Sequence, residues 1–231
     1  MNRTRQHKEP QTPIMKSLIL EKAGLLFWQK GYNNTSMKDI ANACECKPAN
    51  FYNYFSGKED ILYEVVKGIT VKNVSAVGHL AEDEETDPIE QLRVFIKNHF
   101  DLHIHLEQTS AMLSDTSMRH LSQEHREEIV KMRDVYQNTL LKIIQRGQEA
   151  GLFSRNIDER VISYYIPSMI IRSSIWYSSK GRLSIEELSE VLIDFVLNGI
   201  RNADRAPTPD NVNADAGADT APTPDNYAAD N

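Results

Sequence analysis

The sequence predicts an all-α protein, and three observations support this fold class. Apolar residues recur at three- and four-residue spacing along most of the first 200 residues, which is the period of amphipathic helices. No alternating apolar and polar pattern of the kind found in half-buried strands interrupts this series. Gly, Pro and acidic stretches separate segments of helical length. A chain of 231 residues with 40% hydrophobic content has room for a small helical domain and a larger second one.

The first helix is expected over about residues 14–30, where Gly31 ends it. The residues that share its buried face, at i, i+4, i+7 and i+8, are Ile19, Ala23, Leu26 and Phe27. Residues 1–13 are polar, and we expect a disordered arm there. A contact between this basic arm and a DNA minor groove is the alternative.

Two short helices joined by a tight turn are expected between Thr35 and Glu59. Ser36 can cap the first of them, on which Ile40 and Ala41 face inward. The second helix opens at Pro48, a residue type favoured in the first helical turn. This arrangement is a helix-turn-helix, which indicates that the partner is double-stranded DNA.

The second short helix has an inner and an outer surface. Phe51 and Phe55 are four residues apart and are expected to share a buried face. The side chains on surfaces that can meet a duplex are Asn50, Tyr52, Asn53 and Tyr54. The tyrosine hydroxyls have the reach and chemistry to contact phosphate oxygens.

This region resembles the tetracycline-repressor (TetR) family over about residues 14–66. The residues that give the likeness are Gly31-Tyr32, Thr35-Ser36-Met37-Lys38-Asp39-Ile40-Ala41, Phe51-Tyr52-Asn53-Tyr54-Phe55 and Lys58-Glu59. The resemblance implies phosphate contacts by Thr35, Tyr52, Tyr54 and Lys58. It implies positions facing the groove for Lys47, Pro48, Asn50 and Asn53. Ser36 completes the expected DNA-binding set.

The chain departs from the family pattern at three positions. Glu45 stands where the turn glycine is usual, although a glutamate at positive φ is uncommon. Lys47 replaces the usual Ser or Thr cap and adds a charge that can be directed at phosphate. Gly24 stands where a leucine is usual in the first helix.

The net charge of −7 is unevenly distributed along the chain. Residues 1–67 hold 10 Lys and Arg against 7 Asp and Glu, whereas residues 68–202 hold 15 against 20 and residues 203–231 hold 1 against 6. The positive charge therefore lies with the helix-turn-helix. Such a distribution suits a protein that binds one specific DNA site, and the overall charge argues against a general nucleic-acid coat.

The two cysteines, Cys44 and Cys46, are too few for a disulfide framework and indicate a reducing compartment. We expect both to pack as small apolar side chains, with a redox pair or half of a metal site as the alternatives. No apolar run reaches the roughly 18 residues needed to span a bilayer, and the N-terminus lacks the apolar region of a signal peptide. A cytoplasmic protein without membrane contact is expected.

A longer helix starts near Lys58 and belongs to both domains. Its periodic apolar residues are Ile61, Leu62, Val65, Val66 and Ile69. The acidic stretch Glu82–Asp87, followed by Pro88, predicts a loop. A further helix is expected over about residues 88–107, packed through Leu92, Phe95, Ile96 and Phe100.

A long amphipathic helix is expected over about residues 123–150, after a less regular segment at 109–122. Its apolar stripe consists of Ile129, Met132, Tyr136, Leu140 and Ile143. We expect Gly147 and Gly151 to loosen its C-terminal end.

The last two helices are expected over Val161–Tyr177 and Ser184–Arg201. The first is apolar on nearly every side, and Pro167 is expected to kink it. Apolarity all round implies burial by more than one partner, so we expect both helices to form a four-helix bundle with a second chain, as TetR relatives usually do. The alternative is that both helices complete the core of a monomer.

These elements predict four regions. Residues 14–60 form the three-helix DNA-binding domain, and residues 61–202 form the helical domain for effector binding and dimerisation. Residues 1–13 are the arm described above. Residues 203–231 contain Ala-Pro-Thr-Pro-Asp-Asn twice in acidic surroundings and are expected to be a disordered tail.

Histidines are the first candidates for chemistry. His99 and His103 are four residues apart on one helix, with His105 nearby, which raises the question of a metal site. The spacing supplies at most two ligands on one face, so we interpret them as polar pocket or surface residues and expect neither a metal nor another cofactor. No ordering of Ser, His and Asp, paired carboxylates or Gly-rich loop predicts an enzyme.

Arg172 and Trp176 lie one turn apart on an otherwise apolar helix and share a face. One interpretation is a structural pairing with a carboxylate or a place at the dimer seam. The other is an anion-binding arginine beside an aromatic platform. A stretch of about 30 residues, through Arg172-Ser-Ser-Ile-Trp176-Tyr177, Gly181-Arg182-Leu183-Ser184 and Glu187-Leu188, resembles a TetR branch that controls fatty-acid and steroid breakdown. Some members of that branch sense acyl-coenzyme A, and the resemblance implies coenzyme A contacts for Arg172 and Trp176.

The sequence as a whole predicts a homodimeric transcription regulator, a repressor that a small-molecule effector releases from palindromic DNA. The expected ligand-binding residues besides Arg172 and Trp176 are Met112, Leu113, Met132, Tyr136, Met169 and His103. Two alternatives stay open: a DNA-binding or architectural protein without an effector, and a helical metal-dependent enzyme.

Overall fold

The computed structural model describes residues 12–105 and 117–202, and within these ranges the chain is helical with no β-sheet. The α-helices are α1 (Thr12–Lys30), α2 (Met37–Ala43), α3 (Lys58–Val77), α4 (Pro88–His105), α6 (Gln123–Glu149), α7 (Glu159–Trp176) and α8 (Ile185–Ile200). Short 3-10 helices are η1 (Pro48–Asn53), η2 (Gly78–Ala81) and η3 (Met118–His120). The predicted all-α fold class is confirmed.

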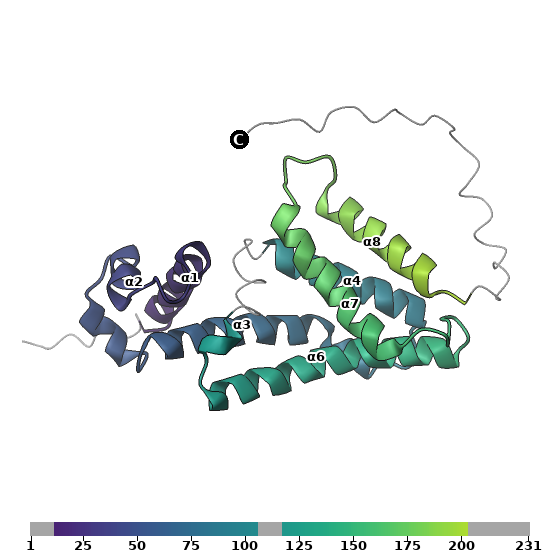
Figure 1. Cartoon of the computed structure of the whole chain (residues 1–231), viewed down its shortest axis with the longest axis horizontal. Coiled ribbons are helices and arrows are strands. Elements are labelled where there is room, and N and C mark those ends of the chain that lie inside the picture. Colours follow the sequence, from purple (N-terminus) through teal and green to yellow (C-terminus); the bar gives the residue numbers. More distant parts are fainter. Residues whose placement is uncertain (1–11, 106–116, 203–231) are drawn as a thin grey trace, which may run out of the picture.

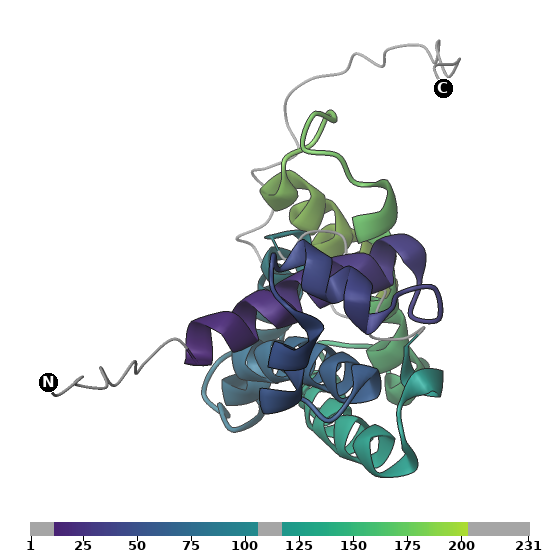
Figure 2. The same ribbon diagram turned by 90° about the vertical axis from the view of Figure 1, so that its left-hand side faces the viewer.

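The helices form an elongated molecule with a small unit at one end. α1, α2 and the beginning of α3 make up that end, and α3 and α6 extend from it along the molecule (Figure 1). α4, α7 and α8 cover the other end. Figure 2, turned by 90°, shows α1 and α2 projecting as the nearest part of the molecule.

Two separate clusters of buried apolar side chains match this division. The first joins α1, α2, η1 and the first turns of α3, and it also takes in Leu121 and Ile129. The second joins α4, the C-terminal half of α6, α7 and α8, with Phe95, Phe100 and Phe153 fully buried in it. Each end of the molecule therefore has its own core, and α6 contributes to both.

The helix α2 begins and ends where its sequence dictates. The Ser36 hydroxyl accepts the Asp39 N–H at 3.1 Å, and the Asp39 carboxylate accepts the Ser36 N–H at 2.8 Å, which completes a capping box. At the other end the N–H of Cys46 donates to the Ala41 carbonyl and that of Glu45 to the Asn42 carbonyl. This pair of bonds is a Schellman motif, which requires a left-handed residue at Glu45, whose φ is 52°.

Replacing Glu45 with glycine should increase the free energy of unfolding by roughly 0.5–1 kcal/mol. A side chain in the left-handed region costs about 1–2 kcal/mol, and glycine avoids this cost. The greater backbone freedom of glycine in the unfolded chain offsets part of the gain. Urea denaturation measures this change. Glu45→Ala is the control, since it removes the carboxylate but keeps the Cβ. Equal stabilisation by alanine and glycine would show that the charge, and not the backbone, is responsible.

The acidic loop before Pro88 is held by one arginine of α6. Arg146 donates through Nη1 to the carbonyl of Asp83 and to Gln91, at 2.6 and 2.7 Å. Through Nη2 it donates to the carbonyls of Glu84 and Thr86, at 2.8 and 3.2 Å. Three backbone acceptors that no helix satisfies thus find a charged donor.

The expectation that glycines loosen the end of α6 was wrong for Gly147. The helix continues to Glu149, and Gly147 is buried beneath the ring of Phe153. A Cβ at this position would overlap that ring. The carbonyl of Gly147 also accepts the N–H groups of Leu152 and Phe153, at 2.8 and 3.0 Å. Gly151, with φ of 69°, is the left-handed residue that turns the chain after the helix.

The last two helices differ in the way their apolar residues are placed. α7 is one helix with Pro167 buried inside it, and α8 starts with a capping box between Ser184 and Glu187. Leu188, Val196 and Ile200 are buried in the second core, as expected for the inner face of α8. Phe195 is 66% exposed and Val191 is also exposed, so α8 has a second apolar face that the rest of the described structure does not cover.

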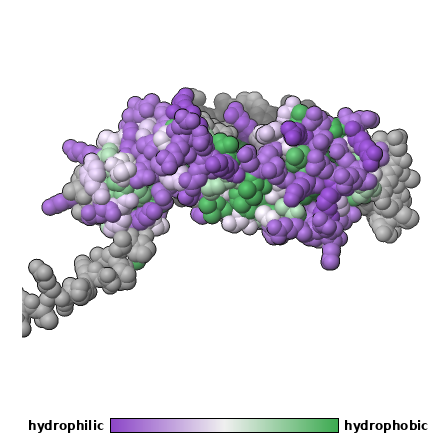
Figure 3. All heavy atoms as spheres, turned by 90° about the horizontal axis from the view of Figure 1, so that it is seen from below, coloured by the Kyte–Doolittle hydropathy of each residue, from purple (hydrophilic) through white to green (hydrophobic). Residues whose placement is uncertain are grey.

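Polar and charged side chains cover most of the face seen from below, with apolar side chains gathered near the middle (Figure 3). Each helix in residues 12–105 and 117–202 is too short or too polar to cross a lipid bilayer.

Candidate nucleic-acid interface and effector pocket

The outer surface of the helix-turn-helix presents polar side chains on a buried aromatic base. Phe51 and Phe55 are buried in the first core, which confirms the predicted inner face of this segment. Tyr52 is 67% exposed, and Asn53 and Lys47 are exposed as well. These side chains have the hydrogen-bonding groups that DNA-binding surfaces use toward phosphates and base edges.

The second helix of the motif is shorter and tighter than an ordinary recognition helix. It is the six-residue 3-10 helix η1, which opens at Pro48 as expected. The side chains of Pro48 and Asn50 lie outside the described part of the structure. Tyr54 is half-buried with its ring tilted against Phe55, at 6.4 Å between centroids, so less of it faces outward than of Tyr52.

Thr35 and Lys58 hold the motif in place, which is a different role from the phosphate contacts that the resemblance implies. Thr35 is 1% exposed, and its hydroxyl donates to the carbonyls of Leu26 and Gly31. Lys58 Nζ donates to the carbonyls of Tyr32 and Thr35, at 2.9 and 2.8 Å. A phosphate contact by the Thr35 side chain was therefore a wrong expectation for this conformation, and Lys58 has two of its three donors already engaged.

The Ser36 hydroxyl is likewise engaged, since it caps α2 and donates to Asp39 at 2.6 Å. The two cysteines are free, and Cys44 is buried in the first core as predicted. Burial raises the pKa of Cys44 to about 11, which keeps it a thiol at neutral pH. Because the thiolate is the reactive form, this environment disfavours the redox alternative.

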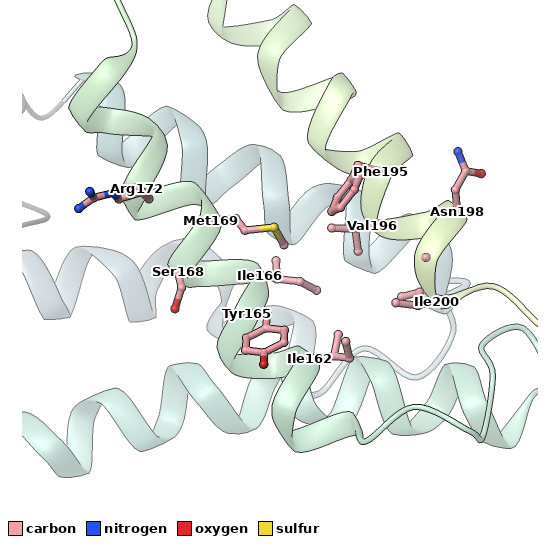
Figure 4. Close-up of a pocket in the computed structure, with 11 residues that line it drawn as sticks. Ile162, Tyr165, Ile166, Ser168, Met169, Arg172, Phe195, Val196, Asn198 and Ile200 are labelled. Atoms are coloured by element: carbon pink, nitrogen blue, oxygen red, sulfur yellow. The ribbon is translucent and has the colours of Figure 1, made fainter.

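An apolar groove of about 770 Å³ lies between α7 and α8 (Figure 4). The side chains that line it include Ile162, Tyr165, Ile166, Met169, Phe195 and Val196, with Arg172 at one end. In Figure 4 the Arg172 guanidinium points away from the other lining side chains. Within the described ranges Arg172 forms no ion pair, so the carboxylate partner that one interpretation requires is not found there.

Sequence patterns of known families match both ends of the chain. The pattern described as "Bacterial regulatory proteins, tetR family" matches residues 19–65. The pattern described as "Tetracyclin repressor-like, C-terminal domain" matches residues 85–200, which is half of the chain. The chain belongs to the TetR family. It is a DNA-binding regulator of transcription that contains a helix-turn-helix, as the sequence predicts.

Individual TetR-family proteins resemble the chain over most of its length. The transcriptional repressor KstR2 of Mycobacterium tuberculosis (strain ATCC 25618 / H37Rv) is 23% identical over 183 residues, which are 79% of this chain and 90% of the relative. The fatty acid metabolism regulator protein of Bacillus subtilis (strain 168) is 25% identical over 187 residues, or 80% and 94%. The structure of AibR in complex with isovaleryl coenzyme A and operator DNA has the same fold, with a TM-score of 0.70 and 23% identity over 78% of this chain and 97% of AibR.

Among the residues expected to bind an effector in this TetR-family chain, those that the structure describes do not form one cluster. Met169 and Arg172 line the groove, and Trp176 is 61% exposed near one end of it on α7. Met132 packs against the first core and Tyr136 against the second. Met112 and Leu113 lie outside the described residues, as does the side chain of His103.

A buried polar pair inside the second core was not foreseen from the sequence. The hydroxyl of Tyr136 is hydrogen-bonded to Nδ1 of His99, which is 2% exposed, and Phe95 packs against both rings. Burial raises the pKa of Tyr136, so the phenol stays protonated. Tyr136 was expected in the apolar stripe of its helix and His99 was interpreted as a polar pocket or surface residue, but the sequence pattern does not show which helices face each other. No group of three potential metal ligands forms among the described residues.

Tyr32 lies against two basic residues, with Lys58 Nζ 4.2 Å from its ring centroid and the imidazole of His120 stacked on it at 4.7 Å. Burial lowers the pKa of His120, and the positive charges of Arg119 and Lys58 lower it further. The folded chain therefore binds this proton less readily than the unfolded chain. The stabilisation that neutral His120 gives to the folded state is fully present above pH 6.5, the ordinary pKa of histidine, and it is lost as the pH falls below that value.

We accordingly expect the melting temperature of the wild type to fall more between pH 8 and pH 5.5 than that of His120→Phe. Phenylalanine keeps a ring against Tyr32 but cannot titrate. Thermal unfolding followed by circular dichroism at both pH values gives the comparison. A pH dependence that is the same in both proteins would contradict the assignment.

Proposed function

We propose that the chain is a homodimeric repressor that binds a palindromic operator and is released from it by a small-molecule effector. The observation that supports this most strongly is the uncovered apolar face of α7 and α8. Tyr164, Tyr165, Val191 and Phe195 are exposed on these two helices. Apolar side chains gathered in this way are typical of a surface that another chain covers, and a second copy gives a four-helix bundle.

A two-fold dimer accounts for the DNA-binding surface as well. One exposed η1 supplies only a few side chains to a duplex, including Tyr52 and Asn53. Two copies related by a two-fold axis can enter successive major grooves about 34–36 Å apart, and they require a palindromic site. The repressor role is supported by the relatives, since KstR2 is named as a transcriptional repressor.

The proposed effector is an acyl-coenzyme A thioester. AibR, which shares the fold, was crystallised with isovaleryl coenzyme A and operator DNA. In this chain Arg172, at one end of the groove, offers a guanidinium without an ion-pair partner among the described residues. An exposed arginine with an exposed tryptophan one turn away suits phosphate groups and a planar base.

The experiment that tests this function starts from duplexes selected from genomic fragments by the purified chain. Fluorescence anisotropy then measures operator affinity with and without acyl-coenzyme A thioesters of short, medium and long chain length. We expect at least one thioester to weaken operator binding about fivefold or more, which is the lower end of ordinary allosteric coupling. Free coenzyme A and the free fatty acids are the controls. Operator binding that no thioester changes would contradict the effector class and favour an effector-independent DNA-binding protein.

Tyr52 and Asn53 should differ in what they contribute to DNA binding. Tyr52→Phe removes a phosphate-directed hydroxyl, so it should weaken binding to the operator and to random duplex by similar factors. Asn53→Ala should weaken operator binding more than random binding, by about 1–3 kcal/mol of discrimination. Anisotropy titrations on both duplexes separate the two effects. Equal losses on both duplexes for Asn53→Ala would rule out a base contact by that residue.

A further inference from the structure

The contact between the DNA-binding end and α6 includes, besides the apolar side chains of Leu121 and Ile129, a set of polar and aromatic side chains. Its members come from the loop after α1 and from α3, η3 and α6, and we call them the junction: Tyr32, Glu59, Tyr63, His120, His125 and Glu128. The expected DNA-binding and effector-binding residues include none of them.

His125 of α6 makes the central contacts of the junction with α3. Its ring is stacked on Tyr63, with 3.8 Å between centroids and 9° between planes. Its Nδ1 lies 3.0 and 3.1 Å from the two carboxylate oxygens of Glu59. Glu59 also accepts the N–H of Ser122, the residue that caps α6, at 2.9 Å. The first turn of α6 is thereby fixed to the first turn of α3.

A second pair of contacts extends this attachment one turn further along both helices. The Tyr63 hydroxyl donates to Glu128 at 2.5 Å, and Lys67 Nζ donates to the other oxygen of Glu128 at 2.7 Å. Burial raises the pKa of Tyr63, and its bond to Glu128 raises it further, so the phenol remains a donor. Two helices that pack through apolar side chains can slide past each other, whereas these directional bonds fix their register.

The junction also reaches the start of the helix-turn-helix. His120 of η3 is stacked on Tyr32, which directly follows the glycine that ends α1. Lys58 joins the carbonyls of Tyr32 and Thr35, and Thr35 precedes the cap of α2. A shift of η3 would therefore displace Tyr32, and with it Thr35 and the start of α2.

The helix α6 continues from the junction into the second core without interruption. It has 27 residues, which corresponds to a length of about 40 Å. Ile129 is buried in the first core, whereas Leu140, Ile143 and Ile144 are buried in the second, where Tyr136 also packs. A change in the packing of the second core that displaces α6 therefore also displaces the residues of α6 in the junction.

We infer that the junction couples the effector domain to the helix-turn-helix, and that His125, which stacks on Tyr63 and contacts the Glu59 carboxylate, is the residue that fixes α6 to α3. This inference rests on the proposed function and specifies how the two ends of the molecule communicate. By linkage, an operator that binds one end must also alter the other end, which gives a test that needs no effector.

The test measures hydrogen exchange of backbone amides, with and without an operator duplex selected from the genome. It compares the wild type with His125→Ala and with His79→Ala, a control that removes an exposed histidine of η2. His125 is half-buried, and its removal should leave the fold intact, which circular dichroism checks. Glu59→Gln is a second variant, because it weakens the same contact from the α3 side.

In the wild type and in His79→Ala, the operator should slow exchange of α6 amides beyond Tyr136 by about fivefold or more. In His125→Ala the operator should still bind, but the slowing should end near Ile129. Glu59→Gln should give an effect in the same direction. Full slowing beyond Tyr136 in both junction variants would overturn the inference, as would a wild type that binds the operator without any slowing beyond Ile129. A wild type that binds no duplex would instead overturn the proposed function, and the inference with it.

Discussion

Replacing Phe195 with lysine should convert the chain from a dimer to a monomer and lower its operator affinity at least a hundredfold. Phe195 is 66% exposed and lines the groove between α7 and α8, so in the proposed dimer it is covered by the second copy. The substitution removes an apolar contact from each chain and brings two like charges to the same seam. An unpaired buried charge costs several kcal/mol, and about 2.8 kcal/mol already corresponds to a hundredfold change in an equilibrium constant.

The control for this prediction is Val135→Lys. Val135 is an apolar residue on α6 that is also about half exposed, but it does not line the groove. Both variants should unfold within about 0.5 kcal/mol of the wild type, because both side chains are exposed in the single chain. Sedimentation velocity and operator anisotropy should therefore distinguish them. A Phe195→Lys protein that sediments as the wild type does and binds the operator normally would exclude the proposed seam.

Replacing Gly147 with alanine should lower the free energy of unfolding by about 3 kcal/mol, although alanine is the better helix former. The Cβ would overlap the ring of Phe153, which is fully buried. Either the helix shifts away from its neighbours or the ring leaves its site, and emptying a buried phenylalanine site costs about 3–5 kcal/mol. Chemical denaturation monitored by circular dichroism gives the value.

Gly68→Ala is the matched control, since Gly68 is an exposed interior residue of α3 with no atom near its would-be Cβ. That variant should be stabilised by up to about 1 kcal/mol. Combining Gly147→Ala with Phe153→Ala should cost less than the two single changes together, because the smaller side chain removes the overlap. Additive costs would indicate that the ring does not cause the effect.

Local sequence rules were sufficient to predict where several helices of this chain begin and which faces they bury. The starts of α2 and α8 were predictable because a capping residue and its partner three positions later act within one turn, as Ser36 with Asp39 and Ser184 with Glu187 do. The buried faces of α4 and α6 followed from helical period, which is also a local property. Glu45 at positive φ shows the limit of residue preference, since the geometry of the turn prevails over it.

Contacts between helices were not predictable in the same way. The role of Gly147 depends on Phe153, whose ring returns to α6 only after a turn at Gly151. The side chains of Thr35 and Lys58 match a family motif, but their hydrogen bonds to backbone carbonyls are visible only in three dimensions. The effector residues were grouped by chemical type, and the structure separates those of α6 from those of the groove.

The most direct measurement of the central claim is the number of chains bound to one operator duplex, determined by sedimentation equilibrium or native mass spectrometry. A dimer that presents two copies of η1 should give two chains on a palindromic duplex, and binding to a duplex with one half-site should be at least about a hundredfold weaker. One chain per duplex, with equal affinity for the whole palindrome and for a single half-site, would contradict the account.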